Sequence, residues 1–127
     1  MAWSQEESIS RDEMQALQLA RLQETVSYVY AGNSYYRQKL DDLGVKPGDI
    51  KSLDDIKRLP FTTKQDLRDN YPFKLFTASP KEIVEYHATS GTTGKPIAVG
   101  YTRKDLEIWS ESMARTCTGA GITSDDV

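Results

Sequence analysis

The residues best suited to chemistry lie in one eight-residue segment, Thr89-Ser90-Gly91-Thr92-Thr93-Gly94-Lys95-Pro96. Its glycines let a backbone approach a ligand closely and turn successive N–H groups toward it. The hydroxyl side chains add hydrogen-bond donors, and Lys95 adds a positive charge. Such a loop suits phosphate oxygens, and the expected ligand is the triphosphate of a nucleotide.

This segment is not a Walker A loop. That motif needs a glycine where this chain has Thr89, and a serine or threonine where it has Pro96. A proline at this position also prevents a helix from following the lysine directly. Two interpretations remain, a solvated hairpin loop and a phosphate-binding loop, and the complete octamer favours the second.

Two further residues are candidates for a functional role. His87 precedes the loop by two residues, so it either lines the nucleotide or acyl site or is a strand histidine bonded to a neighbour. Cys117 lies on an apolar helix stripe, and we expect it to pack in the core. With one cysteine and one histidine, the sequence offers neither an internal disulfide nor a Cys/His zinc site.

The loop needs two strands and a helix to position it. Residues 83–88 and 97–101 have the alternation and composition of strands, and they are expected to pair with each other. A capping pattern at Thr102 predicts a final helix. Its apolar stripe is expected to be core: Leu106, Trp109, Met113 and Cys117.

Before Pro80 the sequence predicts a cluster of helices. The capping box Ser10–Glu13 opens a long helix that Gly32-Asn33 ends. A second helix is expected from about 34 to 43, with Gly44 in the left-handed position that follows a helix. Two further capping patterns open short helices: Ser52-Leu53-Asp54-Asp55 and Thr63-Lys64-Gln65-Asp66.

Composition excludes several classes of function. The chain has 127 residues and a formal net charge of −3, with no basic stripe, which argues against nucleic-acid binding and against a polybasic membrane anchor. No apolar run approaches the roughly 20 residues of a membrane-spanning helix. The N-terminus has neither the basic nor the apolar region of a secretory signal, so a cytoplasmic protein is expected.

The octamer resembles the phosphate-binding signature of the adenylate-forming enzymes, the acyl- and aryl-CoA synthetases and their relatives. Most members continue with a lysine, whereas this chain has Ile97 and then Ala98-Val99-Gly100-Tyr101-Thr102. This departure resembles the phenylacetate–CoA ligase branch, in which Gly-Tyr-Thr follows the loop. Upstream segments resemble that branch too, over nearly the whole chain: Tyr35-Tyr36-Arg37, Pro47-Gly48-Asp49-Ile50, Leu59-Pro60-Phe61-Thr62-Thr63-Lys64, Asp66-Leu67-Arg68 and Tyr71-Pro72-Phe73.

The resemblance implies a fold and a division of the chain. We expect an α/β protein, with a helical N-terminal subdomain at residues 1–80 and the start of an ATP-binding α/β domain at residues 81–127. Because an isolated two-stranded hairpin is marginal in water, these residues are expected to be the N-terminal part of a larger fold.

The resemblance also implies a reaction in phenylacetate catabolism. Phenylacetate, an aromatic carboxylic acid, would react with ATP and coenzyme A, with Mg²⁺, to give phenylacetyl-CoA, AMP and pyrophosphate. Lys95 would neutralise phosphate charge. The other implied phosphate contacts are hydroxyl donors at Thr89, Ser90, Thr92 and Thr93 and close backbone approach at Gly91 and Gly94. No catalytic residue and no metal ligand is assigned within the chain, so alone it is expected to be inactive.

Two other functions stay open at this stage. A relative that adenylates another substrate, such as a ligase transferring AMP to a deazaflavin coenzyme, would carry the same loop. A non-catalytic dimerisation or docking module is the alternative from a different class. In either case the N-terminal helices could join two copies into a homodimer.

Overall fold

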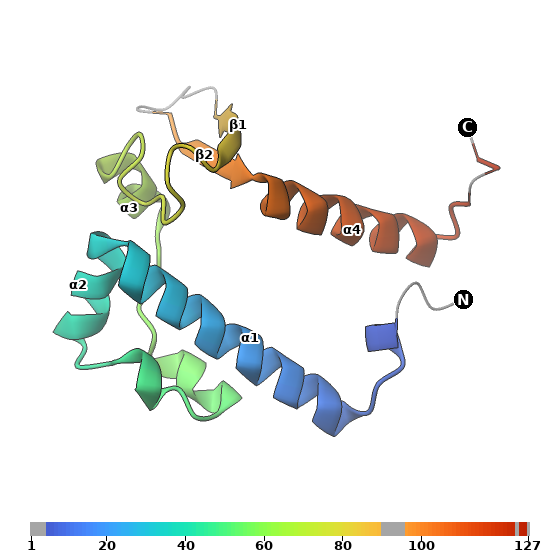
Figure 1. The fold of residues 1–127 in the computed structure, drawn as a ribbon, viewed down its shortest axis with the longest axis horizontal. Helices are drawn as coiled ribbons and strands as arrows, with labels where there is room; N and C mark the ends of the chain where they lie inside the picture. The colour runs from blue at the N-terminus through green and yellow to red at the C-terminus, as the bar shows by residue number, and fades with distance from the viewer. Residues whose placement is uncertain (1–4, 90–95, 124, 127) are drawn as a thin grey trace.

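The computed structural model describes residues 5–89, 96–123 and 125–126. In chain order the elements are η1 (Gln5–Glu7), α1 (Arg11–Gly32), α2 (Ser34–Asp42), η2 (Pro47–Asp49), η3 (Leu53–Arg58), α3 (Lys64–Asp69), β1 (Ile83–Ala88), β2 (Ala98–Thr102) and α4 (Arg103–Gly119). In Figure 1 the β1–β2 hairpin lies near α3, and α4 runs from it toward η1. The expected combination of a mainly helical N-terminal region with two strands is confirmed.

The first long helix begins where its capping box predicts. The Ser10 N–H donates to the Glu13 carboxylate at 2.8 Å, and the Glu13 N–H donates to Ser10 Oγ at 3.3 Å. These reciprocal bonds satisfy two of the amide donors that a helix start leaves free. The helix ends at Gly32, as predicted, and the N–H of Asn33 donates to the Val29 carbonyl.

The core lies between α1, α2 and the turns that follow them. It consists of Val26, Leu40, Val45 and Ile50, each at most 4% exposed. The chain reverses after α2 through Gly44, whose φ of 65° is the predicted left-handed conformation. This reversal lets Val45 and Ile50 pack back against α1.

Asn33 joins the helical cluster to the segment that leads into the hairpin. Its side-chain oxygen accepts from the N–H groups of Tyr35 and Tyr36 and so caps α2. Its Nδ2 donates to the carbonyls of Lys74, at 3.0 Å, and Phe76, at 3.3 Å. The side chain is 3% exposed, so this is a buried polar group with both of its ends bonded.

The two short capping patterns also form. Ser52 and Asp55 open η3, which is a 3₁₀ helix, and Thr63 and Asp66 open α3. The Asp66 carboxylate additionally accepts from the phenol of Tyr35 and lies 3.2 Å from Lys39 Nζ. One carboxylate therefore both caps α3 and fastens it to α2.

The strands β1 and β2 pair antiparallel, as predicted, with His87 opposite Val99 and Tyr86 opposite Gly100. The second strand begins at Ala98, one residue later than expected. A capping box between Thr102 and Asp105 then opens α4 directly at the end of β2. This junction fixes the start of α4 against the hairpin.

One expectation for α4 is wrong. Trp109 and Met113 were expected in the core, but they are 45% and 51% exposed, and Leu106 and Cys117 are half-buried. The spacing correctly marks one apolar face of the helix, yet within the described part of the chain little packs on it.

The division of the chain into two domains at residue 80 stays a prediction. None of the described helices is long and apolar enough to cross a membrane.

Candidate functional site

The hairpin closes the base of the predicted phosphate loop. The N–H of Thr89 donates to the Ile97 carbonyl, and the N–H of Ile97 donates back to Thr89 Oγ1, both at 3.1 Å. Ile97 is 7% exposed, so one end of this pair is anchored in packed structure. The two ends of the loop are thereby fixed side by side. The other predicted phosphate ligands, Ser90–Lys95, lie outside the described residues.

His87 lies on one face of the hairpin, two residues before this base. Its Nε2 is bonded to the carboxylate of Glu85, on the same strand. Its ring meets Tyr101 edge-on at 5.0 Å between centroids and Trp109 at 5.8 Å. The bond to Glu85 is what a strand histidine paired with a neighbour would make, and a role in lining the nucleotide or acyl site stays a prediction.

The hairpin also borders an aromatic pocket that the sequence did not single out. The pocket has a volume of about 240 Å³ and is lined by Tyr71, Pro72, Phe73, Tyr86, His87, Ala88 and Ala98. The rings of Phe73 and Tyr86 lie 5.8 Å apart. In the sequence, Tyr71-Pro72-Phe73 pointed only to a resemblance to the ligase branch. The two aromatic residues of that segment were the signal that could have predicted the pocket. Such a wall suits a flat apolar group rather than a charged one.

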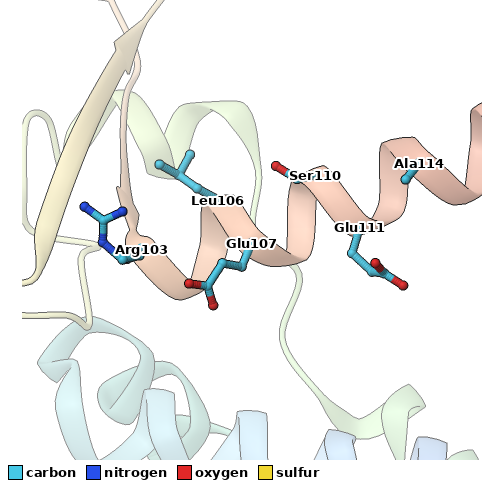
Figure 2. A pocket seen from close by; sticks show the side chains of 6 residues that line it. All are labelled: Arg103, Leu106, Glu107, Ser110, Glu111 and Ala114. Atoms are coloured by element: carbon cyan, nitrogen blue, oxygen red, sulfur yellow. The ribbon is translucent and has the colours of Figure 1, made fainter. Parts of the chain in front are cut away.

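A second hollow, of about 440 Å³, follows one side of α4 (Figure 2). It is lined by Arg103, Leu106, Glu107, Ser110, Glu111 and Ala114. Figure 2 shows Leu106 and Glu107 pointing in different directions from neighbouring positions on the helix. Because every lining residue comes from α4, this is an open helix surface and not an enclosed binding site.

A cluster of charged and hydroxyl groups joins α2 to α3. The phenol of Tyr35, with the backbone and hydroxyl of Thr63, holds the pKa of Asp66 well below its usual range. Burial, followed by its bond to Asp66, raises the pKa of Tyr35. This cluster belongs to the scaffold. Across residues 5–89, 96–123 and 125–126, no group of three or more His, Cys, Asp or Glu side chains could hold a metal ion.

No family model matches the chain. Among curated proteins, it is 48% identical over 120 residues to a phenylacetate-coenzyme A ligase of Escherichia coli, and 48% identical over 115 residues to one of Thermus thermophilus. These matches cover 94% and 91% of this chain but 28% and 26% of the relatives. The chain therefore spans about a quarter of the length of the curated relatives that it matches.

Solved structures of an adenylate-forming enzyme have the same fold over this region. A 2-hydroxyisobutyryl-CoA ligase, in complex with 2-HIB-AMP and CoA, superposes with a TM-score of 0.85 at 34% identity, over 94% of this chain and 26% of that chain. The same ligase in its postadenylation state gives a TM-score of 0.83 at 32% identity. The chain is thus homologous to the N-terminal portion of the phenylacetate-coenzyme A ligases, with CoA ligases of the adenylate-forming kind as its structural neighbours.

Proposed function

We propose that residues 89–95 bind the triphosphate of ATP in an AMP-forming aryl-CoA ligase reaction. One observation supports the proposal: the sequence between β1 and β2 contains the complete octamer Thr89–Pro96, and the Thr89–Ile97 pair closes the hairpin at its two ends. Fixing both ends of a glycine-containing loop reduces the conformational entropy that it loses when a ligand orders it.

Phenylacetate is the proposed acid. Identity to the phenylacetate-coenzyme A ligases is 43–48%, against 31–34% to the 2-hydroxyisobutyryl-CoA ligase structures. The pattern of identity therefore supports an aromatic acid over a small hydroxy acid. The products would be phenylacetyl-CoA, AMP and pyrophosphate.

The first step of such a reaction needs no general base, because a carboxylic acid is already ionised at neutral pH. The carboxylate attacks the α-phosphorus and pyrophosphate leaves, and the thiol of coenzyme A then displaces AMP from the acyl adenylate. Catalysis rests on holding the triphosphate in line and neutralising its charge. We assign charge neutralisation to Lys95 and hydrogen bonding to the loop hydroxyls, and Mg²⁺ would arrive with the nucleotide.

The proposal places no catalytic residue within this chain. We assign recognition of the acid and formation of the thioester to a polypeptide that matches the part of the relatives outside this region. The proposed compartment is the cytoplasm. The exposed side of α1, where Tyr28 is 54% exposed, is the surface proposed for a homodimer.

A chimera tests this function. Residues 1–127 replace the matching segment of the Escherichia coli relative, and phenylacetate-dependent exchange of pyrophosphate into ATP is measured. We expect exchange by the chimera and none by the isolated chain. Lys95→Met should slow exchange by about 10²-fold, the scale of losing one charge-stabilising contact. Lys104→Met, at an exposed lysine on α4, is the matched control. Unchanged exchange in Lys95→Met would contradict the assignment.

A further inference from the structure

The ring of His87, on β1, contacts both of the elements that follow the loop. It lies 5.0 Å from the ring of Tyr101, on β2, and 5.8 Å from that of Trp109, on α4, between centroids. Tyr101 and Trp109 stack on each other at 5.3 Å, so the three rings form one cluster. Among the aromatic contacts of the described residues, the one between His87 and Trp109 is the contact that joins β1 to α4.

The two ends of the proposed phosphate loop are held differently. At the β2 end, Ile97 is 7% exposed, and β2 continues through the capping box of Thr102 and Asp105 into α4. The β1 end is Thr89, which is bonded to Ile97. His87 precedes Thr89 by two residues, so its ring ties this second end to the junction of β2 with α4.

The ring of His87, more than its polar contact, provides this anchor. Its Nε2 is bonded to the carboxylate of Glu85, but the two side chains are 43% and 47% exposed. A polar pair with this exposure contributes little to stability, whereas edge-on contacts between rings contribute beyond the area that they bury. The bond to Glu85 therefore sets the rotation of the ring, and the contacts with Tyr101 and Trp109 hold it in place.

We propose that His87 is a positioning residue for the triphosphate of ATP. By anchoring the β1 end of the loop, it keeps Thr89 beside Ile97 before the nucleotide binds, and it acts through the hairpin rather than by contact with the nucleotide. The inference rests on the proposed function and extends it. Because a fixed base lowers the entropy that the loop loses on ordering, the contribution should appear in the binding of ATP and not in the chemical step.

Two substitutions of His87 separate the ring from the hydrogen bond. His87→Phe keeps a ring and loses the bond to Glu85, whereas His87→Gln keeps a donor and loses the ring. Val84→Gln is the matched control, because Val84 is 50% exposed and lies at the opposite end of the same strand from Thr89. The three variants are made in the chimera, and pyrophosphate exchange is measured as a function of the concentrations of ATP and phenylacetate.

His87→Gln should raise the KM for ATP by about three- to tenfold, the effect expected for losing ring contacts of this kind. The maximal rate and the KM for phenylacetate should stay unchanged. His87→Phe and Val84→Gln should remain within about twofold of the wild type in all three constants. A role in which the imidazole itself contacts the nucleotide predicts instead that His87→Phe is as harmful as His87→Gln, and that result would overturn the proposal.

Trp109→Leu tests whether the anchor works through α4. Alone, it should raise the KM for ATP in the same direction, and it supplies the test if His87→Gln does not fold. In its background, His87→Gln should have a smaller effect, because one of the two ring contacts is already lost. Fully additive effects would overturn the proposal. So would a His87→Gln chimera with a lower Tm and a lower maximal rate but an unchanged KM for ATP, which is the result expected of a purely structural residue.

Hydrogen exchange in the isolated chain separates failure of this inference from failure of the proposed function. His87→Gln should make exchange at the Ile97 amide about threefold faster, and His87→Phe should leave it unchanged. If the amide responds in this way but the wild-type chimera shows no pyrophosphate exchange, the proposed function is contradicted and the anchor of the hairpin is retained. If the chimera is active and His87→Gln changes neither the amide exchange nor the KM for ATP, the positioning role alone is wrong.

Discussion

The ring of Phe76 fills the space beside Gly100, where an added Cβ would come within 2.6 Å of Phe76 Cε2. Gly100 lies opposite Tyr86 in the sheet, and Phe76 and Tyr86 stack with centroids 6.2 Å apart. The missing side chain at Gly100 is therefore what allows an aromatic ring to lie over this face of the hairpin.

Gly100→Ala should destabilise the chain by about 1–3 kcal/mol, because the new methyl group overpacks a contact made by a rigid ring. Urea unfolding measures the change. Gly48→Ala is the control, since a Cβ there would meet nothing within 4 Å. In a Phe76→Ala background the cost of Gly100→Ala should fall, and an unchanged cost would show that Phe76 is not its cause.

Asn33 is expected to be among the most sensitive polar positions. Asn33→Ala removes the cap of α2 and leaves the carbonyls of Lys74 and Phe76 without their donor. The expected loss is about 2–4 kcal/mol, the sum of a cap and a buried hydrogen-bonding group. Asn70→Ala, which removes one bond to the Asp66 carbonyl at 2.8 Å, is the comparison. Equal losses at Asn33 and Asn70 would contradict this account.

Asp66 should make the stability depend on pH. Its pKa is lowered in the folded state by hydrogen bonds from Tyr35 and Thr63, so the folded chain favours the ionised carboxylate more strongly than the unfolded chain does. That stabilisation is complete above the unfolded pKa of about 3.9 and is lost as the pH falls toward the lower folded value. The difference in Tm between the wild type and Asp66→Asn should therefore be largest near neutral pH and shrink below about pH 4.

The control for this series is Asp69→Asn, on the same helix, where the carboxylate accepts from Gln65 at 2.7 Å on the surface. It should lower the Tm at neutral pH less than Asp66→Asn does. If the difference in Tm between the wild type and Asp66→Asn stays constant from pH 7 to pH 3, the ionised carboxylate is not the stabilising group.

Local signals in the sequence predicted the helix starts. The capping boxes at Ser10 and Thr102 are formed by side chains three residues apart, so the information lies within one helical turn. The strands followed from alternation, and the second was placed one residue early because Ile97 bonds with Thr89 before the regular ladder begins. These features depend on neighbours in the sequence.

Other features depend on distant residues and could not be predicted. The bonds of Asn33 span 41 and 43 positions, and the sequence marked it only as a helix end. Trp109 and Met113 form an apolar stripe, but a stripe does not reveal what covers it, so the expectation of a core was wrong. The phosphate-site residues Ser90–Lys95 remain predictions from the octamer, and the aromatic pocket near Tyr86 was missed because its walls are far apart in the sequence.

The pair formed by Thr89 and Ile97 gives the sharpest local prediction. Thr89→Val keeps the shape of the side chain but removes the oxygen that accepts from the Ile97 N–H at 3.1 Å. The expected cost is about 1 kcal/mol, which corresponds to roughly fivefold faster hydrogen exchange at the Ile97 amide if that amide exchanges through local opening. Thr89→Ser keeps the hydroxyl and should preserve the protection.

In the chimera, Thr89→Val should also weaken the binding of ATP, since one of the two bonds that hold the ends of the loop together is lost. Thr89→Ser should retain most of that affinity. If Thr89→Val leaves the exchange of the Ile97 amide unchanged, the hydroxyl does not close the loop. If hydrogen exchange at the Ile97 amide becomes faster while the affinity for ATP stays constant, the hydroxyl bond at the base of the hairpin is structural and does not contribute to nucleotide binding.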